Sequence, residues 1–111
     1  MRVEYGQIWM ADLSPTVANE QGGYRPVVVT SGRHLNNLPI SHAIVVAVTS
    51  RSRGLSHHLP LGQGTGLVKP SWAMAETTRV VSTTRFDGRI GWADASTMEE
   101  LANWLEIFTR P

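Results

Sequence analysis

The spacing of apolar positions changes once along the chain, near residue 94, and this change separates a strand-rich part from a helix. Before that point, apolar residues occur in short runs rich in β-branched and aromatic side chains, with Gly, Pro, Ser and Thr between them, which is typical of short strands joined by turns. The predicted strands are residues 3–13, 25–30, 43–49, 57–61, 71–75, 79–81 and 88–92. The run 43–49 is almost continuously apolar, so we expect it to be the most buried.

A helix is predicted after the last strand. Ser96 followed by Glu99 fits the S-x-x-E capping box, in which each side chain binds a backbone amide left open at a helix start. One apolar face then recurs at helical spacing and can pack on the sheet; it consists of Met98, Leu101, Ala102, Leu105 and Phe108. Trp104 and Ile107 fall outside this face. We expect them to widen the core contact, with a subunit interface as the alternative.

Many short strands and one terminal helix predict a mainly β (α+β) fold, a small, strongly bent antiparallel sheet close to an SH3-like barrel with a C-terminal helix. The length of 111 residues fits a single domain over residues 1–111. A domain of this size leaves much of its surface exposed unless it pairs with a second copy, so a homodimer is physically reasonable.

Composition excludes several classes of site. The chain has no cysteine, which removes disulfides, thiolate nucleophiles and zinc-thiolate sites. Its longest strongly apolar run, residues 43–48, is far shorter than the ~20 residues that cross a bilayer, and no signal-peptide pattern opens the chain. We therefore expect a soluble, cytoplasmic protein with no membrane association.

Charge is unevenly distributed. Residues 1–93 carry a net charge of +4, residues 94–111 carry −3, and arginine outnumbers lysine nine to one. Arginine favours forked contacts to phosphate and stacking on bases, which suits a nucleic-acid partner. Ordinary compositional bias is the alternative explanation.

Arg25 and Thr49 are the strongest candidates for chemistry. Arg25 begins one strand and Thr49 ends the next, and adjacent antiparallel strands bring such ends together. A guanidinium beside a hydroxyl, with a carboxylate such as Glu20 from the preceding loop, can hold a phosphate whose charge grows during transfer. Considered alone, Arg25 is more typical of a surface ion-pair partner, here of Glu20. Thr49 alone is more typical of a strand-end residue that hydrogen-bonds to backbone groups. Their joint placement favours a phosphate site.

A basic loop and two histidines follow Thr49. Ser50, Arg51 and Arg53 suit contacts along a phosphate backbone, with a solvated loop as the alternative. Consecutive strand residues point to opposite faces, so His57 and His58 are not expected to share an ion. His34 and His42 lack ligand spacing as well, and we predict no metal site.

An ordered set of motifs carries a family resemblance. These are G-x-I-W at residues 6–9, E-Q-G at 20–22, R-P-V-V-V at 25–29, T-S-R at 49–51 and R-I-G at 89–91. Together they resemble the MazF/PemK-type toxins of bacterial toxin-antitoxin systems. The resemblance implies the SH3-like fold and a growth-inhibiting mRNA interferase, a sequence-selective, ribosome-independent endoribonuclease that cuts single-stranded RNA as a homodimer.

The resemblance also implies a reaction. Arg25 and Thr49 match the family's catalytic pair, and Glu20 matches a glutamate at the same site. The implied cleavage is metal-independent and uses no cofactor: the substrate's 2′-hydroxyl attacks the adjacent phosphate and leaves a 2′,3′-cyclic phosphate and a 5′-hydroxyl. Arg25 would stabilise charge and Thr49 would orient the phosphate, while either Glu20 or Glu76 would accept the 2′ proton.

RNA contacts are expected along three segments besides the catalytic residues. The expected contact residues are Asn19, Gln21, Ser50, Arg51, Arg53, Glu76, Thr77 and Arg79. Thr77 departs from the family, which usually has glutamine there, and a hydroxyl cannot make the two-point contact to a base edge that an amide makes. A structural ion pair or a dimer contact is the alternative for Glu76 and Arg79.

The expected protein partner is a cognate antitoxin whose acidic, partly disordered segment folds on the toxin. Two other functions compete. A CcdB-like, non-enzymatic poison of DNA gyrase would use a terminal tripeptide containing tryptophan, whereas this chain ends Thr109-Arg110-Pro111 and retains Arg25 with Thr49. An inactive module that binds RNA or an antitoxin stays open because of Thr77.

Overall fold

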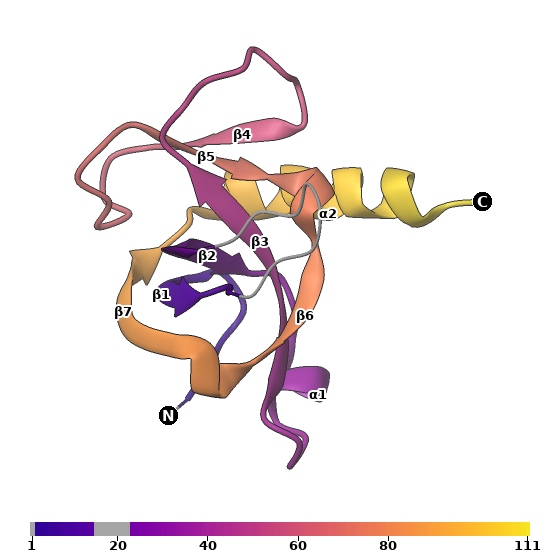
Figure 1. Ribbon diagram of the computed structural model, residues 1–111. Coiled ribbons are helices and arrows are strands. Elements are labelled where there is room, and N and C mark those ends of the chain that lie inside the picture. The colour runs from indigo at the N-terminus through magenta and orange to yellow at the C-terminus, as the bar shows by residue number, and fades with distance from the viewer. Residues whose placement is uncertain (1, 15–22) are drawn as a thin grey trace.

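The computed structural model describes residues 2–14 and 23–111, which form an antiparallel sheet and a C-terminal helix (Figure 1). The strands are β1 (Gln7–Asp12), β2 (Tyr24–Val29), β3 (His42–Thr49), β4 (His58–Leu61), β5 (Ser71–Met74), β6 (Arg79–Ser82) and β7 (Phe86–Trp92). The helices are α1 (Arg33–Asn36), α2 (Ala95–Thr109) and the short 3₁₀ turns η1 (Ala75–Thr77) and η2 (Thr83–Arg85).

The strands follow the order β4-β5-β3-β2-β1-β7, and β6 pairs with β3 beside this path. Each pairing is antiparallel. The strand β3 serves two ladders, because residues 42–45 pair with β6 and residues 48–49 pair with β5. The predicted bent antiparallel sheet with a C-terminal helix is confirmed, and β4 and β7 do not pair with each other in the described part of the chain, so the sheet is open.

The side chain of Thr77 hydrogen-bonds to β3 at the position where this strand changes its pairing from β6 to β5. Its Oγ1 accepts the amide N–H of Ala47 at 2.8 Å and donates to the carbonyl oxygen of Met74 at 2.7 Å. Ala47 lies between the two ladders and is buried. The Thr77 hydroxyl therefore replaces a strand as the partner of a buried amide, which would otherwise carry a desolvation cost.

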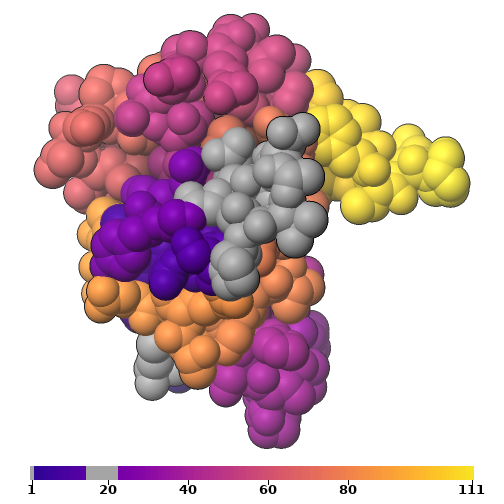
Figure 2. Space-filling model, in the orientation of Figure 1, coloured from indigo at the N-terminus to yellow at the C-terminus, as the bar shows by residue number. Residues whose placement is uncertain are grey.

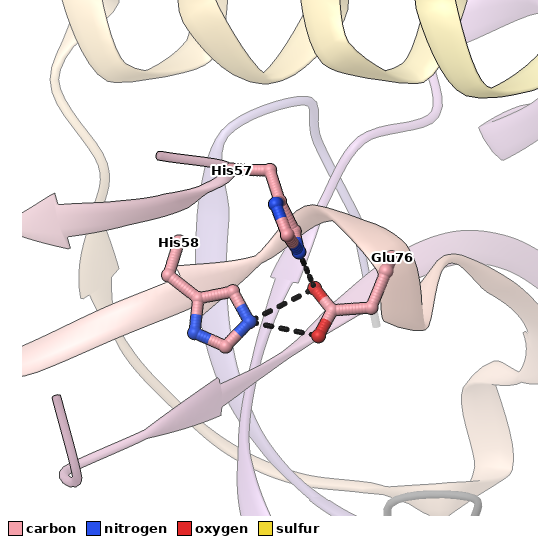
Figure 3. A group of neighbouring side chains, drawn as sticks. All are labelled: His57, His58 and Glu76. Carbon is pink, nitrogen blue, oxygen red and sulfur yellow. Dashed lines mark hydrogen bonds and ion pairs between the residues drawn. The ribbon is translucent and has the colours of Figure 1, made fainter. Parts of the chain in front are cut away.

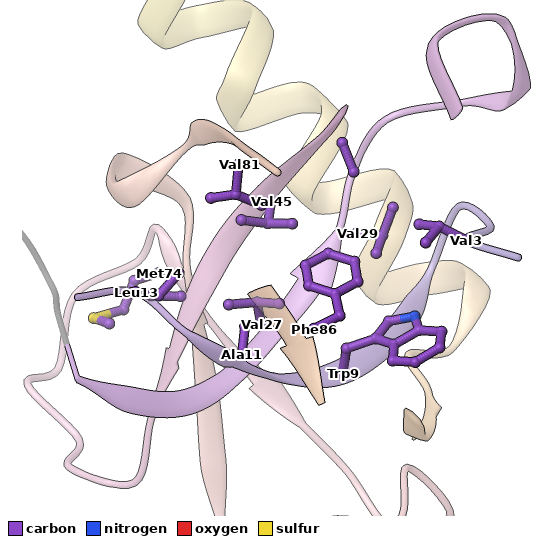
Figure 4. Close-up of a cluster of buried hydrophobic side chains, with 12 residues drawn as sticks. Val3, Trp9, Ala11, Leu13, Val27, Val29, Val45, Met74, Val81 and Phe86 are labelled. Carbon is purple, nitrogen blue, oxygen red and sulfur yellow. The ribbon is translucent and has the colours of Figure 1, made fainter. Parts of the chain in front are cut away.

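Buried side chains form two clusters, one on each face of the sheet. Val27 and Val29 belong to the first cluster, in which Trp9 stacks on Phe86 with ring centroids 5.5 Å apart (Figure 4). Val28 belongs to the second, which packs against Met98 and Leu101 of α2. The run R-P-V-V-V is continuously apolar after Arg25 because β2 is covered on both faces. Strand β3 is covered in the same way, which confirms its expected burial.

The starts of the first strand and of the C-terminal helix differ from the predictions. The first strand begins at Gln7 because Tyr5 and Gly6 form a turn, and Gly6 has a φ of +87°. The helix α2 begins at Ala95, and its N-cap is Asp94, whose Oδ1 accepts the N–H of Thr97 at 3.3 Å. The predicted capping box of Ser96 and Glu99 is wrong, since Ser96 already lies in the first turn. Hydrogen bonds from the side chain and from the backbone N–H of Thr97 lower the pKa of the Asp94 carboxyl.

The C-terminal end of α2 projects beyond the sheet (Figures 1 and 2). Trp104 packs at the edge of the second cluster, as expected. Ile107 is 54% exposed, so its predicted burial is wrong, and Phe108 is 43% exposed. The last turns pass the edge of the sheet, which leaves no core for these side chains to enter.

None of the helices in the described segments is long and apolar enough to cross a membrane.

Candidate active site

A pocket of about 300 Å³ opens beside the ends of β2 and β3. The pairing of these strands runs from Val29 with Val45 to Val27 with Ala47, and the pocket lies past that last pair. Two cationic side chains contribute to its wall, and the lining contains no carboxylate among the residues that the structure describes. The lining residues are Arg25, Pro26, Val48, Thr49, Ser50, Leu67, Val68, Lys69 and Ser71. The pocket therefore suits an anion.

Arg25 and Thr49 come to this pocket from adjacent strands. Arg25 lies two residues before Val27 and Thr49 lies two residues after Ala47, so each residue stands two positions past the last pair of the two strands. Both side chains are half-buried. Both residues line the pocket, so a forked cation and a hydroxyl occur at one site, which is the juxtaposition that the antiparallel order of the strands predicts.

Thr49 also anchors the loop that follows it. Its Oγ1 accepts the amide N–H of Arg51 at 3.1 Å. A hydroxyl that accepts in this way keeps its own proton for donation. Thr49 can therefore donate a hydrogen bond to an anion in the pocket, whereas it has no basicity with which to remove a proton.

The start of β2 is tied to β7 beside Arg25. The phenol of Tyr24 donates to Oδ2 of Asp87 at 2.6 Å. This hydrogen bond raises the pKa of Tyr24, with burial and the charge of Asp87 adding to the effect. Because Tyr24 and Arg25 are consecutive, the contact limits the movement of the strand end that carries Arg25.

Lys69 is a pocket residue that the sequence reasoning missed. It lies on the connection 62–70 between β4 and β5, and its carbonyl oxygen accepts a hydrogen bond from the Ser71 hydroxyl at 2.9 Å. The side chain is exposed at the rim. The available signal was weak: Lys69 is the only lysine of the chain and stands just before a predicted strand.

Two glycines allow the connection 62–70 to pack closely against β7. A Cβ on Gly91 would lie 2.0 Å from the carbonyl oxygen of Thr65, and one on Gly66 would lie 2.4 Å from that of Ile90. Gly66 also has a φ of +90°, which favours glycine. The backbone of the connection therefore lies directly on the last strand and carries Leu67, Val68 and Lys69 to the pocket.

The basic loop expected after Thr49 is exposed. Ser50 lines the pocket, while Arg51 and Arg53 are exposed on the connection between β3 and β4. Neither arginine makes a side-chain ion pair with another described residue. Ser50 is therefore part of the pocket, and the two arginines lie along the chain leading away from it.

Glu76 does not line the pocket and instead faces two histidines (Figure 3). Its carboxylate lies 2.7 Å from Nε2 of His58 and 3.5 Å from Nε2 of His57. The expectation that His57 and His58 point apart is wrong, because β4 begins at His58 and the alternation of a strand does not extend to His57. Glu76 is therefore held in a structural contact, and its partners are the two histidines.

Thr77 and Arg79, predicted to contact RNA, take other places. The Thr77 hydroxyl is engaged by Ala47 and Met74 inside the fold, so it does not offer its proton to a base. Arg79 begins β6 opposite Val45 and does not line the pocket. Its Nη1 is buried and has no hydrogen-bond partner among the described residues. The ion pair considered between Glu76 and Arg79 does not form in this part of the chain.

Three predicted site residues, Asn19, Glu20 and Gln21, lie outside the described residues. The side chain of Arg85 holds the chain that leads toward them. Nη1 of Arg85 donates to the carbonyl oxygens of Asp12, at 3.1 Å, and Ser14. Arg85 therefore anchors the last described residues before that segment, a role for which the sequence offered no signal.

Comparison with known proteins finds one family model and a curated relative that match nearly the whole chain. A model of the PemK-like, MazF-like toxins of type II toxin-antitoxin systems matches residues 4–109. Endoribonuclease EndoA of Bacillus subtilis (strain 168) is 32% identical over 110 residues, which cover 96% of this chain and 94% of that protein.

Solved structures share the fold. The crystal structure of MazF (Form-I) from Deinococcus radiodurans matches with a TM-score of 0.86 and 23% identity, over 97% of this chain and 96% of that one. A chain of the MazE-MazF (Form-II) crystal structure from the same organism matches with a TM-score of 0.79 and 23% identity, over 97% of this chain and 96% of that one. At this identity the likeness shows the fold alone.

Proposed function

Because the chain belongs to the PemK-like, MazF-like toxins of type II toxin-antitoxin systems, we propose that it is an endoribonuclease that cleaves single-stranded RNA at the pocket between β2 and β3. The observation that carries the proposal is the convergence of Arg25, Lys69 and Thr49 on one pocket. Two cations and a hydroxyl donor suit a phosphodiester, whose charge increases during cleavage. The relative named EndoA supports the same activity.

The proposed reaction is an internal transfer. The 2′-oxygen of the substrate attacks the adjacent phosphorus, the bond from phosphorus to the 5′-oxygen breaks, and the products carry a 2′,3′-cyclic phosphate and a 5′-hydroxyl. The 2′-hydroxyl loses its proton and the departing 5′-oxygen gains one. Since attacking and leaving groups both belong to the RNA, the protein has to position the phosphate and stabilise its charge.

Arg25 is proposed to bind the non-bridging oxygens of the phosphorane. A guanidinium offers a planar fork of donors and remains protonated, so it stabilises charge and is a poor source of a proton. Thr49 donates its hydroxyl proton to a phosphate oxygen while its oxygen holds the Arg51 amide. Lys69 supplies a point charge at the rim. No metal step is required, because these groups supply the charge stabilisation.

Glu20 is the proposed acceptor of the 2′ proton. It belongs to the segment leading into β2, close in sequence to Arg25. Asn19, Gln21, Ser50, Arg51 and Arg53 are proposed to extend the RNA contact on either side of the pocket. Glu76 is left out of the chemistry because its carboxylate is engaged by His58.

The proposed partners follow from the family. A toxin of a type II system is neutralised by a protein antitoxin, and an acidic segment complements the positive pocket. We propose that the protein works as a homodimer in the cytoplasm, where messenger RNA lies. Sequence selectivity would arise from the groove that two copies form.

The test uses purified protein and a long RNA in EDTA, with both new ends identified chemically. The proposal expects 2′,3′-cyclic phosphate and 5′-hydroxyl ends. Replacing the ribose before the cut by deoxyribose removes the attacking group and should abolish cleavage at that position. Continued cutting there would exclude internal attack, and absence of any cleavage would favour a toxin that only binds.

A further inference from the structure

His57, His58 and Glu76 bring three metal-ligating side chains together away from the pocket (Figure 3). One ligand atom from each lies within 4.8 Å of the other two. Measured from Oε1 of Glu76, Nε2 of His58 lies at 3.0 Å and Nε2 of His57 at 3.5 Å. Two imidazoles and one carboxylate therefore converge on one point.

Backbone contacts hold this convergence in place. His58 is the first residue of β4 and pairs with Met74, directly before η1. The carbonyl oxygen of His57 accepts the amide N–H of Ala75 at 3.1 Å, and Ala75 precedes Glu76. The two segments that carry the ligands are thus joined directly beside the cluster, which fixes the spacing without any ion.

The donor set matches a zinc site with one open position. Zinc is bound by His nitrogen at about 2.0–2.1 Å and by carboxylate oxygen at similar length, and a tetrahedral site separates its ligand atoms by roughly 3.3 Å. The distances of 3.0 and 3.5 Å from the Glu76 oxygen lie close to that separation. Imidazole and carboxylate together favour zinc and its neighbours cobalt and nickel over magnesium or calcium.

Access and burial differ among the three ligands. The side chain of His58 is 3% exposed, whereas those of His57 and Glu76 are 25% and 43% exposed, so an ion can enter from the side of these two. Binding through Nε2 puts the proton of His58 on Nδ1, which is buried and has no partner among the described residues. This cost makes the site weaker than a closed structural zinc site.

The helix α2 lies beside the cluster. The ring of His57 contacts Trp104 and Phe108, with centroids 5.8 and 5.4 Å apart. An ion that fixes His57 therefore also supports the outer turns of α2, where Phe108 is exposed. This connects the start of β4, the turn η1 and the helix at one point.

We propose that His57, His58 and Glu76 form a binding site for Zn²⁺ that stabilises the fold and takes no part in RNA cleavage. A ligand that binds the folded state alone raises its stability. The site is independent of the proposed nuclease, because none of its ligands lines the pocket of Arg25 and Thr49.

The experiment measures Zn²⁺ binding to tag-free, chelator-treated protein by calorimetry, the melting temperature with and without ZnCl₂, and the visible spectrum with CoCl₂. His57→Phe removes one ligand but keeps an aromatic ring against Trp104 and Phe108, and Glu76→Gln keeps the shape of the carboxylate. His42→Ala is the control, since His42 is exposed and outside the cluster.

Zn²⁺ should raise the melting temperature of the wild type and of His42→Ala, with a tetrahedral cobalt spectrum in both. In His57→Phe and in Glu76→Gln the affinity should fall about tenfold or more, since even loss of an outer partner of a ligand costs about 10–100-fold. Equal binding by all four proteins, or none by the wild type, would overturn the proposal. Cleavage in EDTA tests the nuclease separately.

Discussion

Arg25 and Thr49 line one pocket from the ends of two adjacent antiparallel strands. The side chains differ in what they offer an anion: the guanidinium carries a permanent charge, and the hydroxyl, already accepting from the Arg51 amide, has one proton to donate. Their separate contributions can therefore be measured by substitutions that remove one property at a time.

Replacing Thr49 by valine should lower kcat/KM about 10–100-fold, because a hydrogen bond to a charged group contributes about 1.5–3 kcal/mol. Valine has nearly the shape of threonine, so the loss reports the hydroxyl. Thr49→Ser keeps the donor and should remain within a few-fold of the wild type. Steady-state kinetics on a short RNA that contains one cleavage site measures both. Equal rates for the valine and serine variants would remove Thr49 from the mechanism.

Replacing Lys69 by methionine should raise KM and leave kcat nearly unchanged, because the lysine lies at the rim and contributes a point charge. The loss of one phosphate contact should reduce the slope of log affinity against log salt concentration by about 0.7 on single-stranded RNA. Arg33→Met, an exposed arginine that does not line the pocket, should change neither quantity. An unaltered salt slope in Lys69→Met would exclude a contact with phosphate.

Replacing Thr77 by valine should lower the free energy of unfolding by about 1–3 kcal/mol, because the buried amide of Ala47 loses its acceptor. Denaturant unfolding measures the change. Thr77→Ser retains the hydroxyl and should restore most of the stability, while Thr78→Val changes an exposed neighbour and should cost less than about 0.5 kcal/mol. If Thr77→Val instead changed the positions at which RNA is cut and left the stability unchanged, the result would support a role of Thr77 in base recognition.

These residues show where local rules sufficed for prediction. Arg25 and Thr49 could be brought together from sequence because consecutive antiparallel strands fix which ends meet. The prediction that His57 and His58 point apart failed because side chains alternate only within a strand, and β4 begins at His58. Boundaries of secondary-structure elements are uncertain by a residue or two. The helix start failed for a similar reason, since Asp94 and Ser96 can both cap a helix.

Other features depended on contacts between distant parts of the chain. Lys69 reaches the pocket only because the connection 62–70 seats on β7, where Gly91 leaves room for Thr65. Comparison with the family's usual glutamine predicts an RNA contact for Thr77. Its structural role instead arises from the change of partner along β3. Neither relationship follows from periodicity or propensity, because each joins residues separated by tens of positions.

Replacing Asp94 by alanine should lower the melting temperature at neutral pH, and by more than Ser96→Ala, because Asp94 is the N-cap of α2. Hydrogen bonds from the side chain and the backbone N–H of Thr97 lower the folded-state pKa of Asp94. The stabilisation is therefore full above the ordinary aspartate pKa of about 3.9 and disappears as pH falls through the folded-state pKa. Melting curves of wild type and variant should converge in acid. A gap that widens as pH falls would contradict this assignment.

In the proposed mechanism, Arg25 stabilises the charge of an internal transfer reaction without a metal ion. The most direct measurement compares the rate of RNA cleavage by the wild type and by Arg25→Ala in EDTA, with the unfolding of both followed to verify equal folding. Loss of a charge-stabilising donor should reduce kcat by about 10²–10³, with Arg25→Lys between the two because the ammonium keeps the charge and loses the fork. Undiminished cleavage by Arg25→Ala, or wild-type cleavage that requires magnesium, would exclude this mechanism.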